Sequence, residues 1–188
     1  MTVSEVVVIS GGKSSRMGRD KALLEFGGYS TMAEYQYRKL ERLFDSVYIS
    51  AKSDKFDFRP RLILDRYEAS SPMVALASIG EQIPDRAIFV LSVDTPMVDE
   101  ATIKRMCMSY SNSKADILIA SSPNGTEPLC AIYSPTALQQ AQKLLNMDIH
   151  RLHSLLEVSK IEECYFEEEG LFDNLNRPEE YRRAIEKC

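Results

Sequence analysis

Residues 5–21, EVVVIS followed by GGKSSRMGRDK, decide the fold class. The first part, Glu5–Ser10, is a continuous apolar run of the kind that forms a strand covered by helices on both faces of a parallel sheet. The second part, Gly11–Lys21, begins with two adjacent glycines, which let a ligand approach the backbone closely. Successive backbone N–H groups can form an anion-binding concavity there, and Arg16 and Lys21 add positive charge. The stretch therefore predicts a buried first strand followed by a phosphate-binding loop.

Short apolar runs alternate with helical patterns along most of the chain. Strands are predicted at Glu5–Ser10, Ser46–Ser50, Arg61–Leu64, Ala87–Ser92, Asp116–Ala120, Leu129–Tyr133 and Ile161–Phe166. Helices are predicted at Thr31–Phe44, Met73–Gln82, Asp99–Tyr110, Pro135–Asn146 and Ile149–Val158, with a final helix capped by Asn176 and carrying Glu179 at its third position. This order predicts an α/β fold, a doubly wound three-layer αβα arrangement around a mostly parallel sheet. Residues 1–188 contain no recognisable linker and are expected to form one domain.

Composition excludes several classes of protein. The chain of 188 residues has 23 Lys and Arg against 28 Asp and Glu, a formal net charge of -5, which argues against nucleic acid as the main partner. No run approaches 18 apolar residues and the N-terminus lacks a signal-peptide pattern, so no membrane association and a cytoplasmic location are expected. The 4 cysteines are far apart without a CxxC pair, which predicts reduced thiols rather than a zinc site.

The glycine-rich loop matches neither of the common nucleotide-binding motifs. It contains neither GxxxxGK[ST] nor GxGxxG, and taken alone it could be an ordinary turn with solvated basic residues. Its pattern G-G-x-x-x-R-M-G-x-D-K, however, resembles the signature of the molybdenum cofactor guanylyltransferases, nucleotidyltransferases with a GT-A-like fold. The resemblance implies that Arg16 and Lys21 are catalytic and bind the triphosphate and the departing pyrophosphate. It further implies a nucleotide-binding loop formed by Ile9, Ser10, Gly11, Gly12 and Gly18.

Two acidic residues extend the resemblance. Asp65, after the third predicted strand, resembles the family aspartate that contacts the nucleoside, and Ser92–Pro96 resembles the family's C-D-x-P metal motif. Both lie at carboxyl ends of predicted strands, where open α/β sheets bind ligands. Asp94 is thereby a predicted catalytic residue and Mg²⁺ ligand, since Mg²⁺ favours one or two carboxylates together with substrate phosphates. From the local sequence alone, Asp94 could equally cap a turn.

Further stretches of the chain match the family, while others depart from it. Gly125–Tyr133 resembles the family's PL-A-Y strand and Phe172–Glu179 its F-x-N-x-N-x-P-E ending, which implies that Asn174 and Asn176 hold the metal or the pterin side. The family's G-P-L-A-G-L segment is replaced by Ser71–Leu76, and Ser50 stands where Asn is common. Base and nucleoside contacts are therefore expected to differ at these positions, although Ser50 is still expected to line the nucleotide site.

The resemblance implies transfer of GMP from GTP to molybdenum-molybdopterin, with release of pyrophosphate and with Mg²⁺ as cofactor. It also implies the molybdenum insertion protein or molybdoenzyme chaperones as partners. Two alternatives stay open: a cytidylyltransferase acting on molybdopterin or on a sugar or polyol phosphate, and a nucleotide-binding module without turnover. His150 and His153 could share a helical face as a metal pair, but no third ligand accompanies them, and a helix surface is the expected location.

Overall fold

The computed structural model of the protein describes residues 3–11, 20–67 and 69–186. Their strands are β1 (Glu5–Ile9), β2 (Ser46–Ala51), β3 (Leu62–Leu64), β4 (Ile88–Ser92), β5 (Ile117–Ser122), β6 (Gly125–Tyr133) and β7 (Ile161–Tyr165). The helices are the short 3-10 helix η1 (Lys21–Leu23), α1 (Met32–Leu40), α2 (Pro72–Gln82), α3 (Glu100–Ser111), α4 (Pro135–Asn146), α5 (Leu152–Val158) and α6 (Pro178–Ile185). This order agrees with the alternation predicted from the sequence.

The strands form one 7-stranded sheet in the order β3-β2-β1-β4-β6-β5-β7. Strands β3, β2, β1 and β4 run parallel to one another, β7 runs parallel to β5, and β6 is antiparallel to both β4 and β5. Val7 of β1 lies opposite Tyr48 of β2 and Val90 of β4, so β1 is central. The mostly parallel sheet is as predicted.

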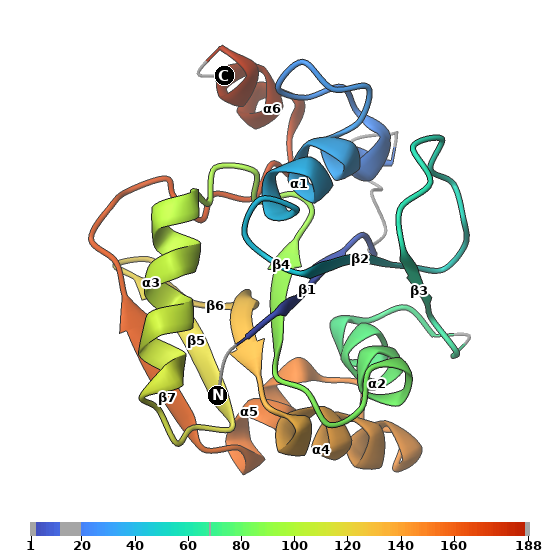
Figure 1. The fold of residues 1–188 in the computed structure, drawn as a ribbon, viewed down its shortest axis with the longest axis vertical. Helices are drawn as coiled ribbons and strands as arrows, with labels where there is room; N and C mark the ends of the chain where they lie inside the picture. The colour runs from blue at the N-terminus through green and yellow to red at the C-terminus, as the bar shows by residue number, and fades with distance from the viewer. Residues whose placement is uncertain (1–2, 12–19, 68, 187–188) are drawn as a thin grey trace.

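Helices cover both faces of the sheet, which places an apolar core on each side (Figure 1). One core joins alternate residues of the central strands, such as Val8 and Leu91, to α1 and α3. The other joins the intervening residues, such as Val7 and Val90, to α2, α4 and α5. Because both faces of β1 are buried, its apolar run has no polar alternation. The three-layer αβα arrangement is confirmed.

Several predicted boundaries were wrong, among them the start of α5, which is Leu152 rather than Ile149. Strand β6 starts at Gly125 rather than Leu129, because Pro123 and Asn124 form a two-residue turn and Gly125 adopts a φ of 119° that glycine tolerates. Helix α1 is shorter than predicted, since Thr31 is its cap, not its first residue, and the helix ends at Leu40.

Another error concerns the start of α6, where Arg177, not Asn176, is the cap residue. Glu180, rather than Glu179, occupies the third position, and its carboxylate accepts hydrogen bonds from the backbone N–H groups of Asn176 at 2.7 Å and Arg177 at 2.8 Å. The capping is therefore done by a glutamate that reaches back, which leaves the Asn176 side chain free for another contact.

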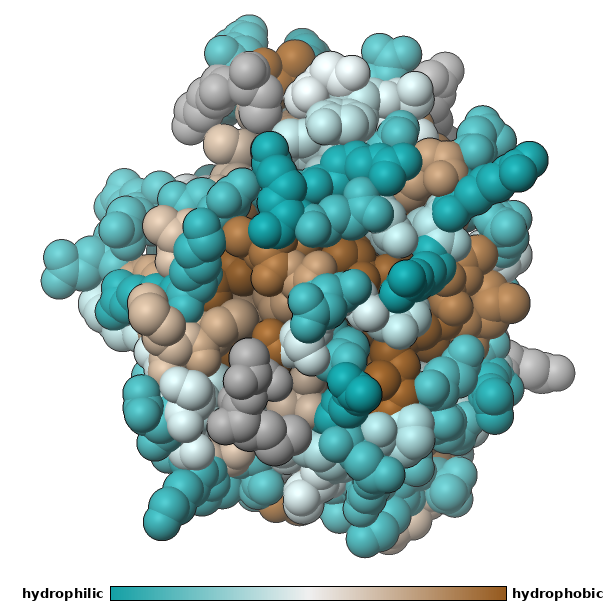
Figure 2. Space-filling view, in the orientation of Figure 1, coloured by the Kyte–Doolittle hydropathy of each residue, from teal (hydrophilic) through white to brown (hydrophobic). Residues whose placement is uncertain are grey.

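Hydrophilic side chains cover most of the surface seen in Figure 2, and hydrophobic ones show between them mainly in the middle of this face. Within the described residues, no helix combines the length and the apolar character that a bilayer crossing requires.

Candidate functional site

The predicted site residues gather at the carboxyl edge of four adjacent parallel strands. Gly11 follows β1, Ser50 lies near the end of β2, Asp65 follows β3, and Asp94 follows β4. The chain order reverses between β1 and β4, since β2 and β3 lie on one side of β1 and β4 on the other. Open α/β sheets bind ligands at such a switch point, outside the carboxyl ends of the strands. The fold thus brings Gly11 and Asp94 to the ligand-binding edge.

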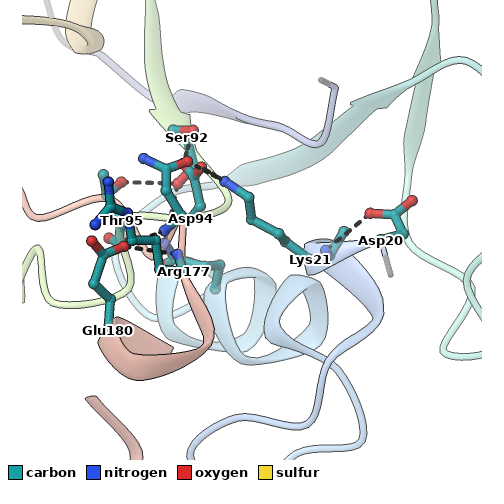
Figure 3. A network of polar contacts seen from close by, with 10 residues as sticks. Asp20, Lys21, Ser92, Asp94, Thr95, Arg177 and Glu180 are labelled. Atoms are coloured by element: carbon teal, nitrogen blue, oxygen red, sulfur yellow. Dashed lines mark hydrogen bonds and ion pairs between the residues drawn. The ribbon is translucent and has the colours of Figure 1, made fainter. Parts of the chain in front are cut away.

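A lysine, an aspartate and an asparagine meet at the switch point. Lys21 Nζ lies 2.6 Å from Asp94 Oδ2 and 2.6 Å from Asn176 Oδ1, although Asn176 is 155 positions later in the chain. Figure 3 shows the Lys21 side chain reaching from η1 toward Asp94. The ion pair is largely buried, with side-chain exposures of 14% for Lys21 and 16% for Asp94. A positive charge is therefore held between two oxygen atoms from different segments.

Hydrogen bonds to neighbouring groups hold the two segments that carry Asp94 and Asn176 in place. Ser92 Oγ donates to Asp94 Oδ1 at 2.6 Å, so both carboxylate oxygens of Asp94 have a partner. The backbone oxygen of Asp94 accepts from Leu175 N–H at 2.9 Å, which ties the segment before α6 to the loop after β4. Helix α6 is anchored in turn by Tyr181, whose hydroxyl donates to the Glu25 backbone oxygen. The C-terminal segment is thereby an integral wall of the site.

The donor set suits a hard divalent cation. Asp94 and Asn176 offer one carboxylate and one amide oxygen, each 2.6 Å from the Lys21 ammonium, and Mg²⁺ takes such oxygen ligands from protein while substrate phosphates and water complete its shell. No group of three or more His, Cys, Asp or Glu side chains that could hold a metal occurs in the described ranges. The arrangement therefore fits a cation shared with a phosphate-bearing substrate better than a zinc site enclosed by protein.

A second polar pair lies toward the β3 edge. Ser50 Oγ donates to Asp65 Oδ1 at 3.3 Å, and the Asp65 N–H donates to the Ala51 oxygen at 3.0 Å. Burial raises the pKa of the Asp65 carboxyl, while the Ser50 hydrogen bond and the positive charge of Lys52 partly oppose this shift. Because β3 and β4 are three strand spacings apart, about 14 Å at roughly 4.8 Å per strand, this pair and Asp94 can contact opposite ends of one extended ligand.

The structure describes only some of the other predicted site residues. Ile9 and Ser10 lie at the end of β1, where Ser10 N–H donates to the Ser50 oxygen at 2.9 Å and the buried Ser10 Oγ has no partner among the described residues. Gly11 is exposed, and among the described residues no atom lies within 4 Å of the position that a Cβ would take there. Gly12, Arg16 and Gly18 lie outside the described residues, so their predicted roles stay predictions.

Asn174 contributes its backbone oxygen to Asn176 N–H at 2.9 Å and lines a cavity of about 550 Å³ together with Met97 and Asp173. It does not take part in the contact between Lys21 and Asp94. His150 and His153 each lie beside one acidic residue, Asp148 at 2.9 Å and Glu157 at 3.3 Å. His153 lies on α5 with an exposed imidazole, as expected for a helix surface. The prediction was wrong for His150, which precedes the first residue of α5, Leu152, so the two histidines do not share a helical face.

Sequence reasoning missed four residues that shape the site: Ser92, Glu180, Gln36 and Lys39. Gln36 and Lys39 are buried polar residues of α1, spaced by three. Their signal in the sequence is weak, because a Gln and a Lys in an amphipathic helix are ordinarily assigned to its solvent face.

Comparison with known proteins agrees with this geometry. The model of the MobA-like NTP transferase domain matches residues 6–164. The chain belongs to this family. The matched range ends before Asn176, so the C-terminal wall of the site lies outside it.

Curated relatives cover nearly the whole chain. A molybdenum cofactor guanylyltransferase from Campylobacter jejuni (strain 81116) is 37% identical over 179 residues, which are 94% of this chain and 93% of that protein. The enzyme of the same name from Helicobacter pylori (strain G27) is 29% identical over 96% of this chain and 90% of its own length. These relatives are nucleotidyltransferases, and the family predicted from the Gly11–Lys21 motif is confirmed.

Solved structures show the same fold. The molybdopterin-guanine dinucleotide biosynthesis protein A from Archaeoglobus fulgidus superimposes with a TM-score of 0.83 at 20% identity, over 98% of both chains. A CMP:2-keto-3-deoxy-manno-octonic acid synthetase, solved with CTP, superimposes with a TM-score of 0.77 at 12% identity, over 99% of this chain and 98% of that one. The predicted GT-A-like nucleotidyltransferase fold is therefore confirmed.

Proposed function

We propose that this protein transfers GMP from GTP to molybdenum-molybdopterin, forming molybdopterin guanine dinucleotide and releasing pyrophosphate. Family membership and the curated relatives support nucleotidyl transfer with these substrates. The structural observation that carries the proposal is the ammonium of Lys21 held between Asp94 Oδ2 and Asn176 Oδ1 at the switch point of the sheet. A cation position of this kind, beside a glycine-rich loop, suits a reaction in which phosphate charge must be neutralised.

The reaction requires positioning rather than a covalent nucleophile. A terminal phosphate oxygen of the pterin substrate attacks the α-phosphorus of GTP, the bond from that phosphorus to the bridging oxygen breaks, and pyrophosphate leaves with the electron pair. When bound, Mg²⁺ neutralises triphosphate charge and polarises the reacting phosphate. Asp94 and Asn176 are the residues that would hold it, and Ser92 fixes the orientation of the Asp94 carboxylate.

Lys21 has a second role in this proposal. Its ammonium ends a flexible side chain and is attached to η1, directly after the glycine-rich loop. When a divalent ion and a triphosphate enter together, the ammonium can leave Asp94 and bind phosphate oxygens that become the pyrophosphate. The lysine thus exchanges one anionic partner for another, and no buried charge is left unpaired.

The nucleoside is assigned to the β2–β3 side of the same edge. Ser50 and Asp65 offer hydrogen-bonding groups there, and Ser71 caps the following helix α2 through the Val74 N–H at 3.3 Å. Mg²⁺ as cofactor, and the molybdenum insertion protein or molybdoenzyme chaperones as receivers of the product, belong to the same proposal.

Pyrophosphate release tests the proposal. Purified protein is mixed with Mg²⁺ and with GTP, CTP, ATP or UTP, in the presence and absence of molybdenum-molybdopterin, and both pyrophosphate and the dinucleotide product are measured. We expect turnover with GTP that depends on the pterin substrate. Preferred turnover with CTP would assign the chain to cytidylyl transfer, and nucleotide binding without pyrophosphate release would assign it to a binding module.

A further inference from the structure

Two side chains of α1 bind the loop that carries Asp94. Gln36 Nε2 donates to the backbone oxygens of Ser92 at 3.3 Å and Thr95 at 3.1 Å. Lys39 Nζ donates to the backbone oxygens of Pro96 at 3.1 Å and Val98 at 2.8 Å. Four carbonyl groups of residues 92–98 therefore receive hydrogen bonds from two side chains spaced one helical turn apart.

Both side chains are buried, which is unusual for these residue types. Gln36 is 0% exposed and Lys39 is 6% exposed, and a buried amide or ammonium costs free energy unless its hydrogen bonds are made. The Lys39 ammonium lies 5.3 Å from the centre of the Tyr35 ring. Burial tends to raise the pKa of the Asp99 carboxyl, but hydrogen bonds from Thr102 and the nearby Lys39 charge bring this pKa below its ordinary value. Asp99 thus provides the negative charge that accompanies the buried ammonium.

The orientation of the Gln36 amide is set by the loop. Its Nε2 faces two carbonyl oxygens, so the opposite orientation would place Oε1 against both of them. The buried Oε1 has no hydrogen-bond partner among the described residues, which is a cost that an apolar side chain would not carry. Simple core packing does not account for a glutamine at this position, whereas holding the two carbonyls does.

The hydrogen bonds continue to the Asp94 carboxylate. The Ser92 backbone oxygen that accepts from Gln36 also accepts from Thr95 Oγ1 at 2.9 Å, and the Ser92 hydroxyl donates to Asp94 Oδ1. Gln36 therefore holds both residues that flank the segment Val93-Asp94. Lys39 holds the continuation of the loop as far as the start of α3.

We propose that Gln36 and Lys39 are positioning residues that fix residues 92–98, so that the Asp94 carboxylate is presented in one geometry to a divalent cation bound with the nucleotide. The inference rests on the proposed function. Neither side chain touches the cation or the nucleotide in this assignment; both act through the backbone of the loop.

The first test measures the loop itself, with no ligand present. Amide hydrogen exchange is followed in Gln36→Met and Lys39→Met, which replace each donor by an unbranched apolar side chain. Thr31→Ala is the matched control. It removes the side-chain cap of the same helix, where Thr31 Oγ1 accepts a hydrogen bond from Glu34 N–H at 3.0 Å, and it leaves the donors to the loop in place. We expect exchange of the Val93, Thr95 and Val98 amides to accelerate about tenfold in both Met variants, as loss of a hydrogen bond predicts, and to be unchanged in the control.

The second test measures cation binding and turnover. Binding of Mn²⁺ in the presence of GTP is followed by the loss of the electron paramagnetic resonance signal of free Mn²⁺. We expect the Met variants to bind Mn²⁺ about tenfold more weakly and to lose kcat in the same proportion, while KM for the pterin substrate stays within about twofold. If a Met variant fails to fold, Lys39→Gln and Gln36→Asn, which keep a donor on a shorter side chain, replace it with the same expectations.

Unchanged loop exchange in the variants would overturn the inference. So would faster exchange combined with unaltered Mn²⁺ binding and kcat. A wild-type protein that binds no Mn²⁺ with GTP and releases no pyrophosphate would instead contradict the proposed function, and the exchange result alone would then decide whether the two side chains hold the loop.

Discussion

The two halves of the carboxyl edge are built differently. At β1 and β4, Lys21, Asp94 and Asn176 are linked by short contacts, and the segments that carry them are bound to each other and to α1. At β2 and β3, Ser50 and Asp65 share one 3.3 Å hydrogen bond beside an edge strand of 3 residues. The half assigned to phosphate chemistry is preorganised, whereas the half assigned to the nucleoside has few internal constraints. Such a division predicts that substitutions beside β2 and β3 leave the contacts of Lys21 with Asp94 and Asn176 in place.

The largest effect is expected for Asp94→Ala, which removes the acid at the centre of the preorganised half. We expect kcat to fall about 10²–10⁴-fold, because a metal contributes several kcal/mol to phosphoryl-type chemistry and each 1.36 kcal/mol is a factor of ten. Asp116→Ala, at the opposite edge of the sheet where its carboxylate binds Lys160 N–H, is the control and should retain activity. Near wild-type rates for Asp94→Ala at saturating Mg²⁺ would show that this aspartate only caps a turn.

Lys21→Ala should have the next largest effect and should act through the triphosphate. We expect the affinity for GTP to fall about tenfold to a hundredfold, which corresponds to the free energy of one hydrogen bond to a charged group. The loss should be smaller for GDP and smallest for GMP, because these nucleotides lack phosphates that Lys21 would bind. Titration of the wild type and the variant with the three nucleotides measures this gradient. Lys104→Ala, an exposed lysine of α3 paired with Glu100, should bind all three as the wild type does. Equal losses for GTP and GMP would mean that Lys21 supports the loop rather than the phosphates.

In the less constrained half, Asp65→Asn should change stability in a pH-dependent way. The pKa of Asp65 is raised in the folded protein, so its charged form is disfavoured there, and its contribution to stability is lost as pH rises through that pKa. Asn is neutral at every pH. We therefore expect the Tm of Asp65→Asn to exceed that of the wild type by about 1–2 °C at pH 7 and to equal it near pH 3.

Thermal unfolding at the two pH values checks this expectation. A lower Tm at pH 7 would show that the Lys52 charge and the Ser50 hydrogen bond outweigh burial. Because this half is assigned to the nucleoside, the same variant should also weaken binding of GTP and GMP by a similar factor, in contrast to Lys21→Ala.

The smallest effect is expected for the double replacement of His150 and His153 by Gln. Both imidazoles are exposed and lie beside single carboxylates, outside either half of the site. We expect kcat and KM to stay within about twofold, which corresponds to the small energies of surface ion pairs. A large loss of rate in a folded variant would reveal a contact with substrate that the fold does not suggest.

The strands, the sheet type and the position of Asp65 and Asp94 at strand ends could be predicted from the sequence. The continuous apolar run Val6–Ile9 predicts a buried strand from its local pattern alone. The ends of such strands then indicate the sheet edge at which Asp65 and Asp94 lie. The contact between Lys21 and Asn176 could not be predicted, because it depends on how α6 docks against the turn at Glu25. The donors Gln36 and Lys39 were missed for a similar reason: their burial depends on the loop after β4, and helix periodicity carries no information about that loop.

The docking of α6 also determines when the site becomes complete during synthesis. A ribosome that has released the chain as far as β7 has delivered the whole sheet together with Lys21 and Asp94, but has not yet delivered Asn176 or the segment that binds the Asp94 backbone. The partial protein could fold its sheet and still lack the second oxygen of the cation position. The two-sided hold on the Lys21 ammonium is therefore completed only when the C-terminal segment docks, and the same step adds Phe172, Leu175 and Ala184 to one of the two cores.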